Sequence, residues 1–367
     1  MSFGARALIR LGALKHNLDV IRNAAPDARV MAVIKANAYG HGMVTVAKQL
    51  DDADSFAVAR LPEAQLLRES GIEKPIVLLA GVMSDEERRV AFEQGFELVV
   101  HDVEQVSMLE RARGTAGTVW LKFDTGMNRL GFPPDAAARL IRMLRASEVV
   151  SELRLMTHLA SADEPDNPAT ETQFEEFKPV TRGFDGAVSI ANTPATLGWL
   201  QGVDARGALG FKGDFWVRPG ISLFGVSPFA DTTGLDLGLK PVMQFEATLI
   251  AVKPLYAGAR VGYRGAHISE SDTTLGIIAV GYGDGYTRHF RSGTPVLING
   301  RRVPLIGNVS MDMIAVDLGR DTSDQVGDLA ILWGDGLSVE EIAPWADAIP
   351  YELVCGVMNR EASEVID

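Results

Sequence analysis

Lysine, tyrosine, histidine and arginine side chains stand directly after apolar runs in this sequence of 367 residues. Lys35 follows the run VMAVI, residues 30–34, and Tyr39 comes four residues later. Comparable positions after other apolar runs hold Lys122, Asp124, Arg129, His158, Asn192, Thr193, Arg218, Gly220 and Ile221. A lysine among other cations in a dry pocket has a lowered pKa, and its neutral amine is a nucleophile toward aldehydes. Together with a phosphate seat and an arginine facing a ring nitrogen, such a lysine indicates a pyridoxal phosphate site.

Each of these side chains also has an ordinary interpretation when it is taken alone. Lys35 could extend its apolar stem and place its charge in solvent. His158 could be a hydrogen-bonded core histidine, and Lys122 could pair with Asp124 at the end of its strand. Arg218 could be an ordinary surface arginine. These alternatives stay open until the residues are considered together.

The apolar runs themselves predict the element that positions these side chains. They are residues 30–34, 56–59, 75–81, 97–100, 118–124, 153–160, 187–192 and 215–220. Helix patterns lie between most of them; one opens at Pro62 and stops at Gly71, and another pairs Asp102 with Gln105 as in a capping box. This alternation predicts a (β/α)₈ TIM-type barrel, in which the ends of all strands meet at one rim. A doubly wound open sheet is the alternative, but no Gly-x-Gly-x-x-Gly turn follows the first strand.

The pattern changes in residues 226–241, which are rich in Gly, Pro, Thr and Asp and predict a linker. Beyond them the chain reads mainly as strands, and Asn299-Gly300 between two apolar runs predicts a hairpin. We therefore expect a barrel domain over residues 1–230, whose first residues pair with a second, mostly β-strand domain over residues 231–367.

Composition limits the class of protein. The formal net charge of −13 disfavours nonspecific binding to nucleic acid or to an anionic membrane. Apolar runs are all shorter than a membrane span, and the N-terminal residues lack the continuous apolar core of a signal peptide. Cys355 is the only cysteine, which fits a reducing compartment. We expect a cytoplasmic protein without a structural metal.

Eight stretches of the sequence resemble, in the same order, the motifs of alanine racemases. They are AVIKANAYGHG (32–42), LKFDTGMNRLG (121–131), THLASADE (157–164), IANTPA (190–195), VRPGISLFG (217–225), VGYRG (261–265), AVGYGDGY (279–286) and GNVSMDMIAVD (307–317). The resemblance implies a pyridoxal 5′-phosphate enzyme that interconverts L- and D-alanine, for cell-wall synthesis or for use of D-alanine.

The resemblance also implies two bases on opposite faces of the substrate. Lys35 would hold the cofactor and act as the base on one face, and Tyr263 would be the base on the other. His158 would support Tyr263. Arg218 would face the pyridine nitrogen, where an always-charged guanidinium discourages protonation of the ring.

The remaining positions of the motifs imply ligands for the cofactor and the substrate. The cofactor set is Tyr39, His158, Asn192, Thr193, Arg218, Gly220 and Ile221, in which Tyr39, Thr193 and the amides of Gly220 and Ile221 hold the phosphate. Arg129 and the amide of Met311 would bind the substrate carboxylate. Lys122, at a position often carbamylated in the family, would orient Arg129. Tyr282 would narrow the entrance to the site, and Asp312 would have a supporting role.

Tyr263, Tyr282 and Met311 fall in the predicted β-domain, and in the family this domain reaches the barrel of a partner subunit. A homodimer with two shared sites is therefore implied. Two of the departures from the family pattern concern cofactor contacts: Ser189 stands where a histidine is usual, and Asn359 stands where a phosphate-binding tyrosine is usual. Cofactor affinity and substrate preference depend on these positions.

Alternatives to alanine racemisation differ in chemistry. A racemase for serine or for a broader range of amino acids would use the same scaffold. Related decarboxylases would be expected to bring a reactive cysteine and an acidic residue to the site. A pyridoxal phosphate-binding homeostasis protein would hold the cofactor without catalysis, but that class has no β-domain.

Overall fold

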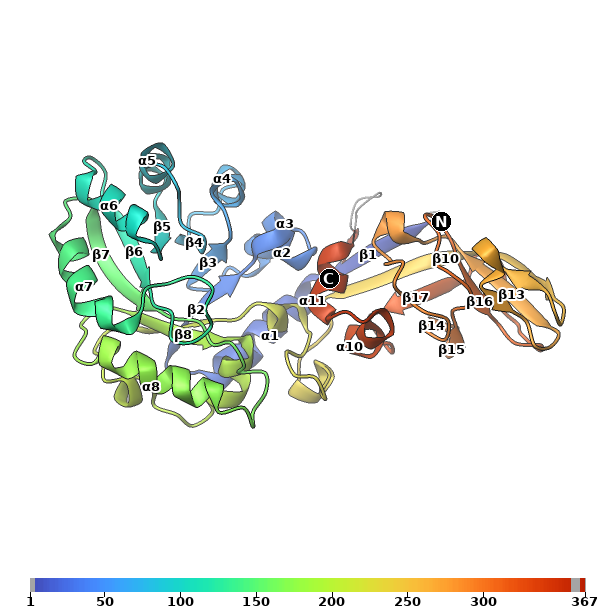
Figure 1. Ribbon diagram of the computed structural model, residues 1–367. Helices are drawn as coiled ribbons and strands as arrows, with labels where there is room; N and C mark the ends of the chain where they lie inside the picture. Colours follow the sequence, from blue (N-terminus) through green and yellow to red (C-terminus); the bar gives the residue numbers. More distant parts are fainter. Residues whose placement is uncertain (1–3, 358–363, 367) are drawn as a thin grey trace.

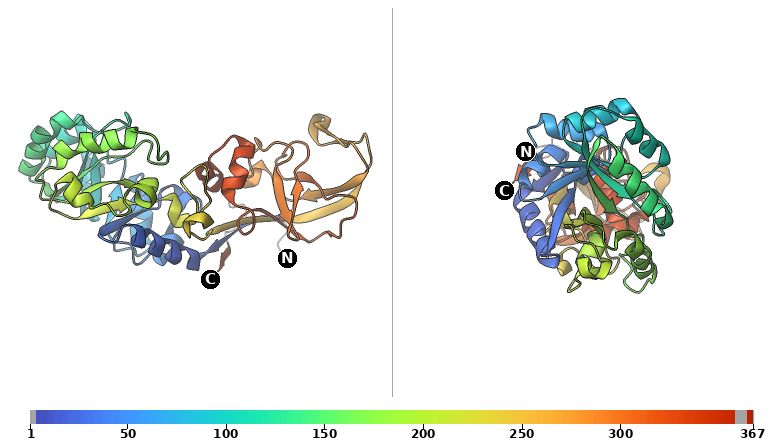
Figure 2. Two further views of the ribbon diagram at one scale, coloured as in Figure 1. Left: turned by 90° about the horizontal axis from the view of Figure 1, so that it is seen from below. Right: turned by 90° about the vertical axis from the view of Figure 1, so that its left-hand side faces the viewer.

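The chain forms two parts that lie end to end, a barrel and a β-domain (Figure 1). A computed structural model describes residues 4–357 and 364–366. The left-hand view of Figure 2 shows the elongated arrangement, with the barrel at one end and the strands of the β-domain at the other, and the right-hand view looks at the barrel end. Asn359, one of the departures from the family pattern, lies outside the described residues.

Eight parallel strands close into the predicted barrel, which confirms the fold class. The strands are β2 (Ala28–Val33), β3 (Ser55–Val58), β4 (Ile76–Leu78), β5 (Phe96–Val100), β6 (Gly117–Lys122), β7 (Val150–Met156), β8 (Val188–Asn192) and β9 (Phe215–Arg218). β2 pairs with both β3 and β9, so the ring has no free edge. Because the strands are buried by the barrel interior on one side and by helices on the other, most read as apolar runs. The exception is β7, whose first residues, Val150–Glu152, are not fully buried and precede the predicted run.

Helices connect and cover these strands. They are α1 (Leu11–Ala24), α2 (Lys35–Tyr39), α3 (Met43–Gln49), α4 (Leu61–Glu69), α5 (Asp85–Glu93), α6 (Val103–Arg111), η1 (Pro134–Ala136), α7 (Ala137–Ala146), α8 (Ala169–Thr181), the π-helical turn η2 (Ala195–Trp199), α9 (Ala205–Leu209) and η3 (Ile221–Phe224). The helices predicted from Pro62 and from Asp102 are both present, and the capping box of Asp102 with Gln105 is formed. Among the described residues, no helix is long and apolar enough to cross a bilayer.

The β-domain is built on a long strand, β10 (Met243–Leu255), against which other strands pair from both ends of the chain. Its remaining elements are β11 (Arg260–Val261), η5 (Tyr263–Gly265), β12 (His267–Ile268), β13 (Thr273–Ile278), η6 (Tyr282–Asp284), β14 (Pro295–Ile298), β15 (Arg301–Pro304), β16 (Ile314–Asp317), β17 (Leu329–Trp333), α10 (Val339–Ile342), η7 (Ala343–Ala346), α11 (Pro350–Gly356) and β18 (Glu364–Ile366). The hairpin predicted at Asn299-Gly300 joins β14 to β15, with φ values of 47° and 76° at these two residues.

The first strand of the chain belongs to this second sheet. β1 (Ala5–Arg10) pairs antiparallel with β10, with Ala5 opposite Ala247, and parallel with β18. Between the barrel and β10, residues 226–241 contain no strand and one short 3₁₀ helix, η4 (Leu235–Leu237).

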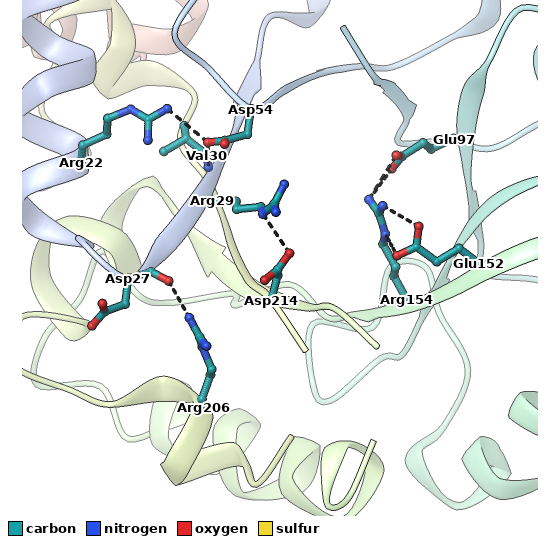
Figure 3. Close-up of polar contacts among 10 residues, drawn as sticks. All are labelled: Arg22, Asp27, Arg29, Val30, Asp54, Glu97, Glu152, Arg154, Arg206 and Asp214. Atoms are coloured by element: carbon teal, nitrogen blue, oxygen red, sulfur yellow. Dashed lines mark hydrogen bonds and ion pairs between the residues drawn. The ribbon is translucent and has the colours of Figure 1, made fainter. Parts of the chain in front are cut away.

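Charged side chains gather toward the N-terminal ends of the barrel strands (Figure 3). Arg154 pairs with Glu97 at 3.1 Å and with Glu152 at 2.7 Å. Its guanidinium lies 5.2 Å from the ring centre of Trp120 and 5.5 Å from that of Trp216, and the Trp120 indole donates to Glu97 at 2.6 Å. This end of a barrel ordinarily serves stability, whereas the opposite end carries chemistry.

Candidate active site

The chain leaves β2 at the C-terminal rim through one turn of left-handed helix. Ala36, Asn37, Ala38 and Tyr39 have φ values between 52° and 54°. Each such L-residue costs roughly 1–2 kcal/mol compared with a right-handed conformation. The left-handed conformation continues into Gly40, with a φ of 84°, and the sequence pattern did not predict it.

Glu63, at the start of α4, holds this turn. One of its carboxylate oxygens accepts from the Ala36 amide at 2.8 Å, and the other accepts from the Ala59 amide at 2.7 Å. Sequence reasoning missed this role. The available signal was the acidic residue in the first turn of α4, which occupies the position of a capping box.

Helix α11 packs over the same turn from the C-terminal part of the chain. Gly40 has a φ of 84°, and a Cβ atom there would lie 2.2 Å from the Val354 carbonyl oxygen. The rings of Tyr39 and Tyr351 are 6.2 Å apart. Only glycine permits this approach, so Gly40 fixes the distance between the Lys35 turn and α11.

Lys35 begins the turn and is partly buried at the barrel rim. Burial lowers the pKa of its ammonium group, and the positive charge of Arg129 lowers this pKa further. The carboxylate of Glu63 and the thiol of Cys355 oppose the shift. A larger neutral fraction makes the amine a better nucleophile toward an aldehyde.

Arg218, at the end of β9, is buried and donates to several acceptors of the neighbouring strands. Its guanidinium donates to the Ser189 hydroxyl, to the Thr157 carbonyl oxygen at 2.6 Å and to Nδ1 of His158 at 3.2 Å. Ser189 in turn donates to the Trp216 carbonyl oxygen at 2.7 Å. The serine that replaces the usual histidine of the family is therefore a direct partner of Arg218.

This arrangement determines the protonation of His158. A guanidinium can only donate, so Nδ1 accepts and the neutral ring carries its proton on Nε2. Burial and then the charge of Arg218 lower the pKa of His158 well below its ordinary value. Burial also lowers the pKa of Arg218 to about 10, which leaves the guanidinium charged at neutral pH.

Three predicted phosphate ligands meet where β9 ends. The Gly220 amide donates to the Thr193 hydroxyl at 2.8 Å. A Cβ atom on Gly220 would lie 2.4 Å from the Tyr39 hydroxyl oxygen. Ile221 follows at the start of η3. The two hydroxyls and the buried backbone of Gly220 thus form a small polar cradle.

Asn192 is placed beside this cradle but is engaged within the protein. Its side-chain amide donates to the Leu159 carbonyl oxygen at 3.1 Å, and its side-chain oxygen accepts from the Ala195 amide at 3.3 Å. It therefore connects the end of β8 to the segment that follows His158.

Lys122 and Arg129 come from β6 and from the loop after it. The carboxylate of Asp124 accepts from the backbone amides of Gly126 and Asn128 at 2.9 and 3.0 Å and from that of Arg129 at 3.1 Å, which fixes this loop. Burial, followed by the charge of Arg218, lowers the pKa of Lys122 to about 8.

A second group of predicted residues lies in the β-domain. The Tyr282 amide donates to the Ser310 carbonyl oxygen at 3.0 Å, and the Gly283 amide donates to that of Met311 at 2.9 Å. Asp312 follows in the same loop. Tyr263 lies in η5, and the adjacent Gly262 would place a Cβ atom 3.9 Å from the Asn308 amide. The segments around residues 262, 282 and 311 are thus neighbours.

The two groups differ sharply in exposure. Arg218, Lys122, Tyr39 and Thr193 of the barrel group are buried, whereas the Tyr263 side chain is 73% exposed and Met311 is 50% exposed. Figure 2 shows the β-domain extending away from the barrel in the same chain. The structure therefore brings the predicted residues together as two sets: a barrel set that is largely buried apart from the exposed Arg129, and a set presented on the surface of the β-domain.

The barrel set fits pyridoxal phosphate. An amine with a lowered pKa suits an aldehyde, and a buried, charged guanidinium suits a ring nitrogen. The Tyr39 and Thr193 hydroxyls, which meet at Gly220, suit a phosphate group.

Comparison with known proteins agrees over both parts of the chain. A family model described as "Alanine racemase, N-terminal domain" matches residues 9–228, and "Alanine racemase, C-terminal domain" matches residues 242–365. The chain is 47% identical to an alanine racemase of Vibrio vulnificus over 97% of both chains, and 46% identical to one of Yersinia pestis over 99% of both. It is similar to the crystal structure of biosynthetic alanine racemase from Pseudomonas aeruginosa, with a TM-score of 0.92, 40% identity and full coverage of both chains.

Proposed function

The chain belongs to the alanine racemase family, and on this premise we propose that it interconverts L-alanine and D-alanine with pyridoxal 5′-phosphate as cofactor. The observation that carries the proposal is the barrel set, in which Lys35 follows β2, the buried Arg218 ends the neighbouring strand β9, and the Tyr39 hydroxyl of the Lys35 turn lies against Gly220. Bound pyridoxal phosphate supplies an aldehyde that takes up the amino group of a substrate and a ring that withdraws electrons from its Cα.

Different residues of the barrel set would bind different parts of the cofactor. Lys35 would hold the aldehyde end, and Arg218 would donate to the ring nitrogen. The phosphate would lie against the Tyr39 and Thr193 hydroxyls and the amides of Gly220 and Ile221. Because Arg218 is always charged, it disfavours a second positive charge on the ring.

Racemisation requires a proton to leave one face of Cα and another to arrive on the opposite face. We assign the first face to Nζ of Lys35 and the second to the hydroxyl oxygen of Tyr263 of the partner subunit. His158 carries its proton on Nε2, because Nδ1 accepts from Arg218. It can therefore donate to that tyrosine oxygen and stabilise its anion.

The substrate carboxylate would be held by Arg129 and by the amide of the partner's Met311. Lys122 has a pKa of about 8, so a substantial part of its amine is neutral just above neutral pH. A neutral amine attacks carbon dioxide and releases a proton to give a carbamate. We propose that Lys122 carries this modification and thereby gives Arg129 an anionic partner.

A homodimer would bring the two sets together. Residues 231–367 of one chain would cover the barrel set of its partner, so that the exposed Tyr263, Tyr282 and Met311 complete the partner's site. The 73% exposure of the Tyr263 side chain in a single chain supports this arrangement, since a base has to be shielded from water to work efficiently.

Isotope incorporation tests the two-base assignment. The protein, purified with pyridoxal phosphate, is incubated with L-alanine in deuterated water, and both enantiomers are separated and analysed by mass spectrometry. We expect deuterium at Cα of both enantiomers and loss of the bound-cofactor absorbance in Lys35→Ala. Deuterated L-alanine without any D-alanine would contradict the role of Tyr263. Parallel incubations with L-serine decide between an alanine-specific and a broader racemase.

Dilution tests the shared site. Because each site needs two chains, specific activity should fall together with the dimer fraction, measured by analytical ultracentrifugation. A fully active monomer would exclude the assignment of Tyr263 and Met311 to the partner's site. Retention of cofactor without any racemisation would instead support the homeostasis class.

A further inference from the structure

Gln173, on α8, joins two of the loops that carry the barrel set. Its side chain is 3% exposed. Its amide nitrogen donates to the His158 carbonyl oxygen at 3.0 Å and to the Thr125 hydroxyl at 3.3 Å, and its amide oxygen accepts from the Ala160 backbone amide at 2.8 Å.

The orientation of this side-chain amide is determined by its partners. A backbone amide can only donate and a carbonyl oxygen can only accept, so exchanging the nitrogen and oxygen of Gln173 would break the bonds to both Ala160 and His158. Both N–H groups of the side chain are used, one toward each loop. Gln173 therefore hydrogen-bonds to the backbone at two points around His158, the carbonyl of His158 itself and the amide of Ala160.

The bond to Thr125 extends the connection to a second loop. The Thr125 and Thr157 hydroxyl oxygens are 2.9 Å apart, and Thr157 donates to the Phe123 carbonyl oxygen at 3.0 Å. Thr125 directly follows Asp124, whose carboxylate holds the Arg129 amide. The same side chain thus touches the segments that place His158 and Arg129.

We propose that Gln173 is a positioning residue of the racemase, which holds His158 against Arg218 and keeps the Arg129 loop in register with it. The proposal rests on the function proposed above. Gln173 touches neither His158's ring nor the guanidinium of Arg218, and it acts through the backbone on either side of His158. Helix α8, on the outside of the barrel (Figure 1), thereby sets the geometry of a group at the rim.

The distance from His158 to Arg218 has a measurable consequence. The charged groups that act on His158 are Arg218, Lys122, Arg129 and Lys35, all of them cationic, and together with burial they lower its pKa. If the backbone of residues 158–160 moves away from Arg218, the ring becomes more hydrated and less strongly repelled. The pKa of His158 then rises toward its ordinary value.

Gln105 provides a matched control. It is also 3% exposed, lies on the first turn of a barrel helix and bridges two loops at the same rim. Its oxygen accepts from the His101 and Asp102 amides at 2.8 and 3.2 Å, and its nitrogen donates to the Val82 carbonyl oxygen at 3.3 Å. None of these loops carries a predicted site residue.

The test compares Gln173→Met with Gln105→Met, because methionine keeps the length of the side chain and removes its hydrogen bonds. Thermal unfolding of both holoenzymes measures the structural cost, which should be similar. Alanine racemisation in Gln173→Met should fall roughly ten- to a hundredfold in kcat/KM, as expected for a displacement of about 1 Å in a catalytic group, while Gln105→Met stays near the unchanged protein.

A second measurement does not depend on activity. NMR titration of ¹³C-labelled histidine rings, with the His158 signal assigned from a His158→Asn variant, should give a higher pKa in Gln173→Met and an unchanged value in Gln105→Met. An unchanged His158 pKa with unchanged kinetics would overturn the proposal, as would equal effects of both variants. If the unchanged protein does not racemise alanine, the proposed function fails, while the titration still decides whether Gln173 positions His158.

Discussion

Replacing Ala36 by glycine distinguishes the effect of the left-handed turn on the stability of the protein from its effect on activity. Ala36 is exposed, has a φ of 53°, and donates its amide to Glu63 at 2.8 Å, a bond that glycine retains. An alanine in this conformation costs roughly 1–2 kcal/mol, which glycine avoids. Glycine also gives the unfolded chain more conformational freedom, which lowers the free energy of unfolding by roughly 0.4–1 kcal/mol. The difference is a net stabilisation of about 0.5–1 kcal/mol.

The same substitution should lower activity. A turn that relaxes more easily holds Lys35 and Tyr39 less firmly relative to each other, so kcat should fall about three- to tenfold. Thermal unfolding of the holoenzyme and steady-state racemisation measure the two effects. The control is Ala138→Gly, because Ala138 is exposed on the right-handed helix α7, away from the site residues. Glycine in a right-handed helix lowers the free energy of unfolding by about 0.5–1 kcal/mol. If Ala36→Gly destabilises the protein as Ala138→Gly does, the reasoning about the left-handed turn is wrong.

Three further substitutions probe other parts of the chain. Arg154→Met leaves Glu97 buried without its cation and should lower the free energy of unfolding by about 3 kcal/mol. Racemisation kinetics should be unchanged. An unchanged free energy of unfolding would show that the ion pair is solvated. Burial lowers the pKa of His41 to about 4, below its unfolded value of 6.5. The stability that the neutral ring contributes is therefore complete above pH 6.5 and is lost as the pH falls toward 4. The total loss is about 3 kcal/mol. Denaturant unfolding across this range should therefore show a flatter pH dependence, by about one proton, in His41→Asn. Gly40→Ala would place a Cβ atom 2.2 Å from the Val354 carbonyl oxygen and should displace α11, which would be measured as loss of bound cofactor at unchanged far-UV circular dichroism.

Much of the fold could be predicted because its signals are local. Each barrel strand appears as its own apolar run, and Asn299-Gly300 marks its hairpin with two residues that accept positive φ values. Hydrogen bonds between distant segments leave no such signal. Glu63 and Gln173 look like ordinary helix residues, and their roles arise only when the rim loops fold against them. The turn at residues 36–39 also escapes prediction, since alanine and tyrosine ordinarily avoid the left-handed conformation.

The candidate site was predictable to a different degree. The strand ends identified which side chains meet at the rim, and the structure brings Arg218, His158 and Ser189 into direct contact. The motifs alone did not show that Ser189 accepts a hydrogen bond from Arg218, because that depends on the close approach of β8 and β9. The separation of Tyr263 from the barrel set became visible only in three dimensions.

The pairing of β1 with β10 links the beginning of the chain to its second half during synthesis. Residues Ala5–Arg10 are synthesised before the barrel, but their partners Met243–Ala247 follow more than 200 residues later. At about 5–20 residues per second, this strand waits for roughly 10–50 seconds without a neighbour to accept its backbone hydrogen bonds. The barrel can close in the meantime, so the nascent chain passes through a stage in which a finished barrel carries an unpaired strand ahead of it. A C-terminal half expressed alone would lack that strand and expose the edge of β10.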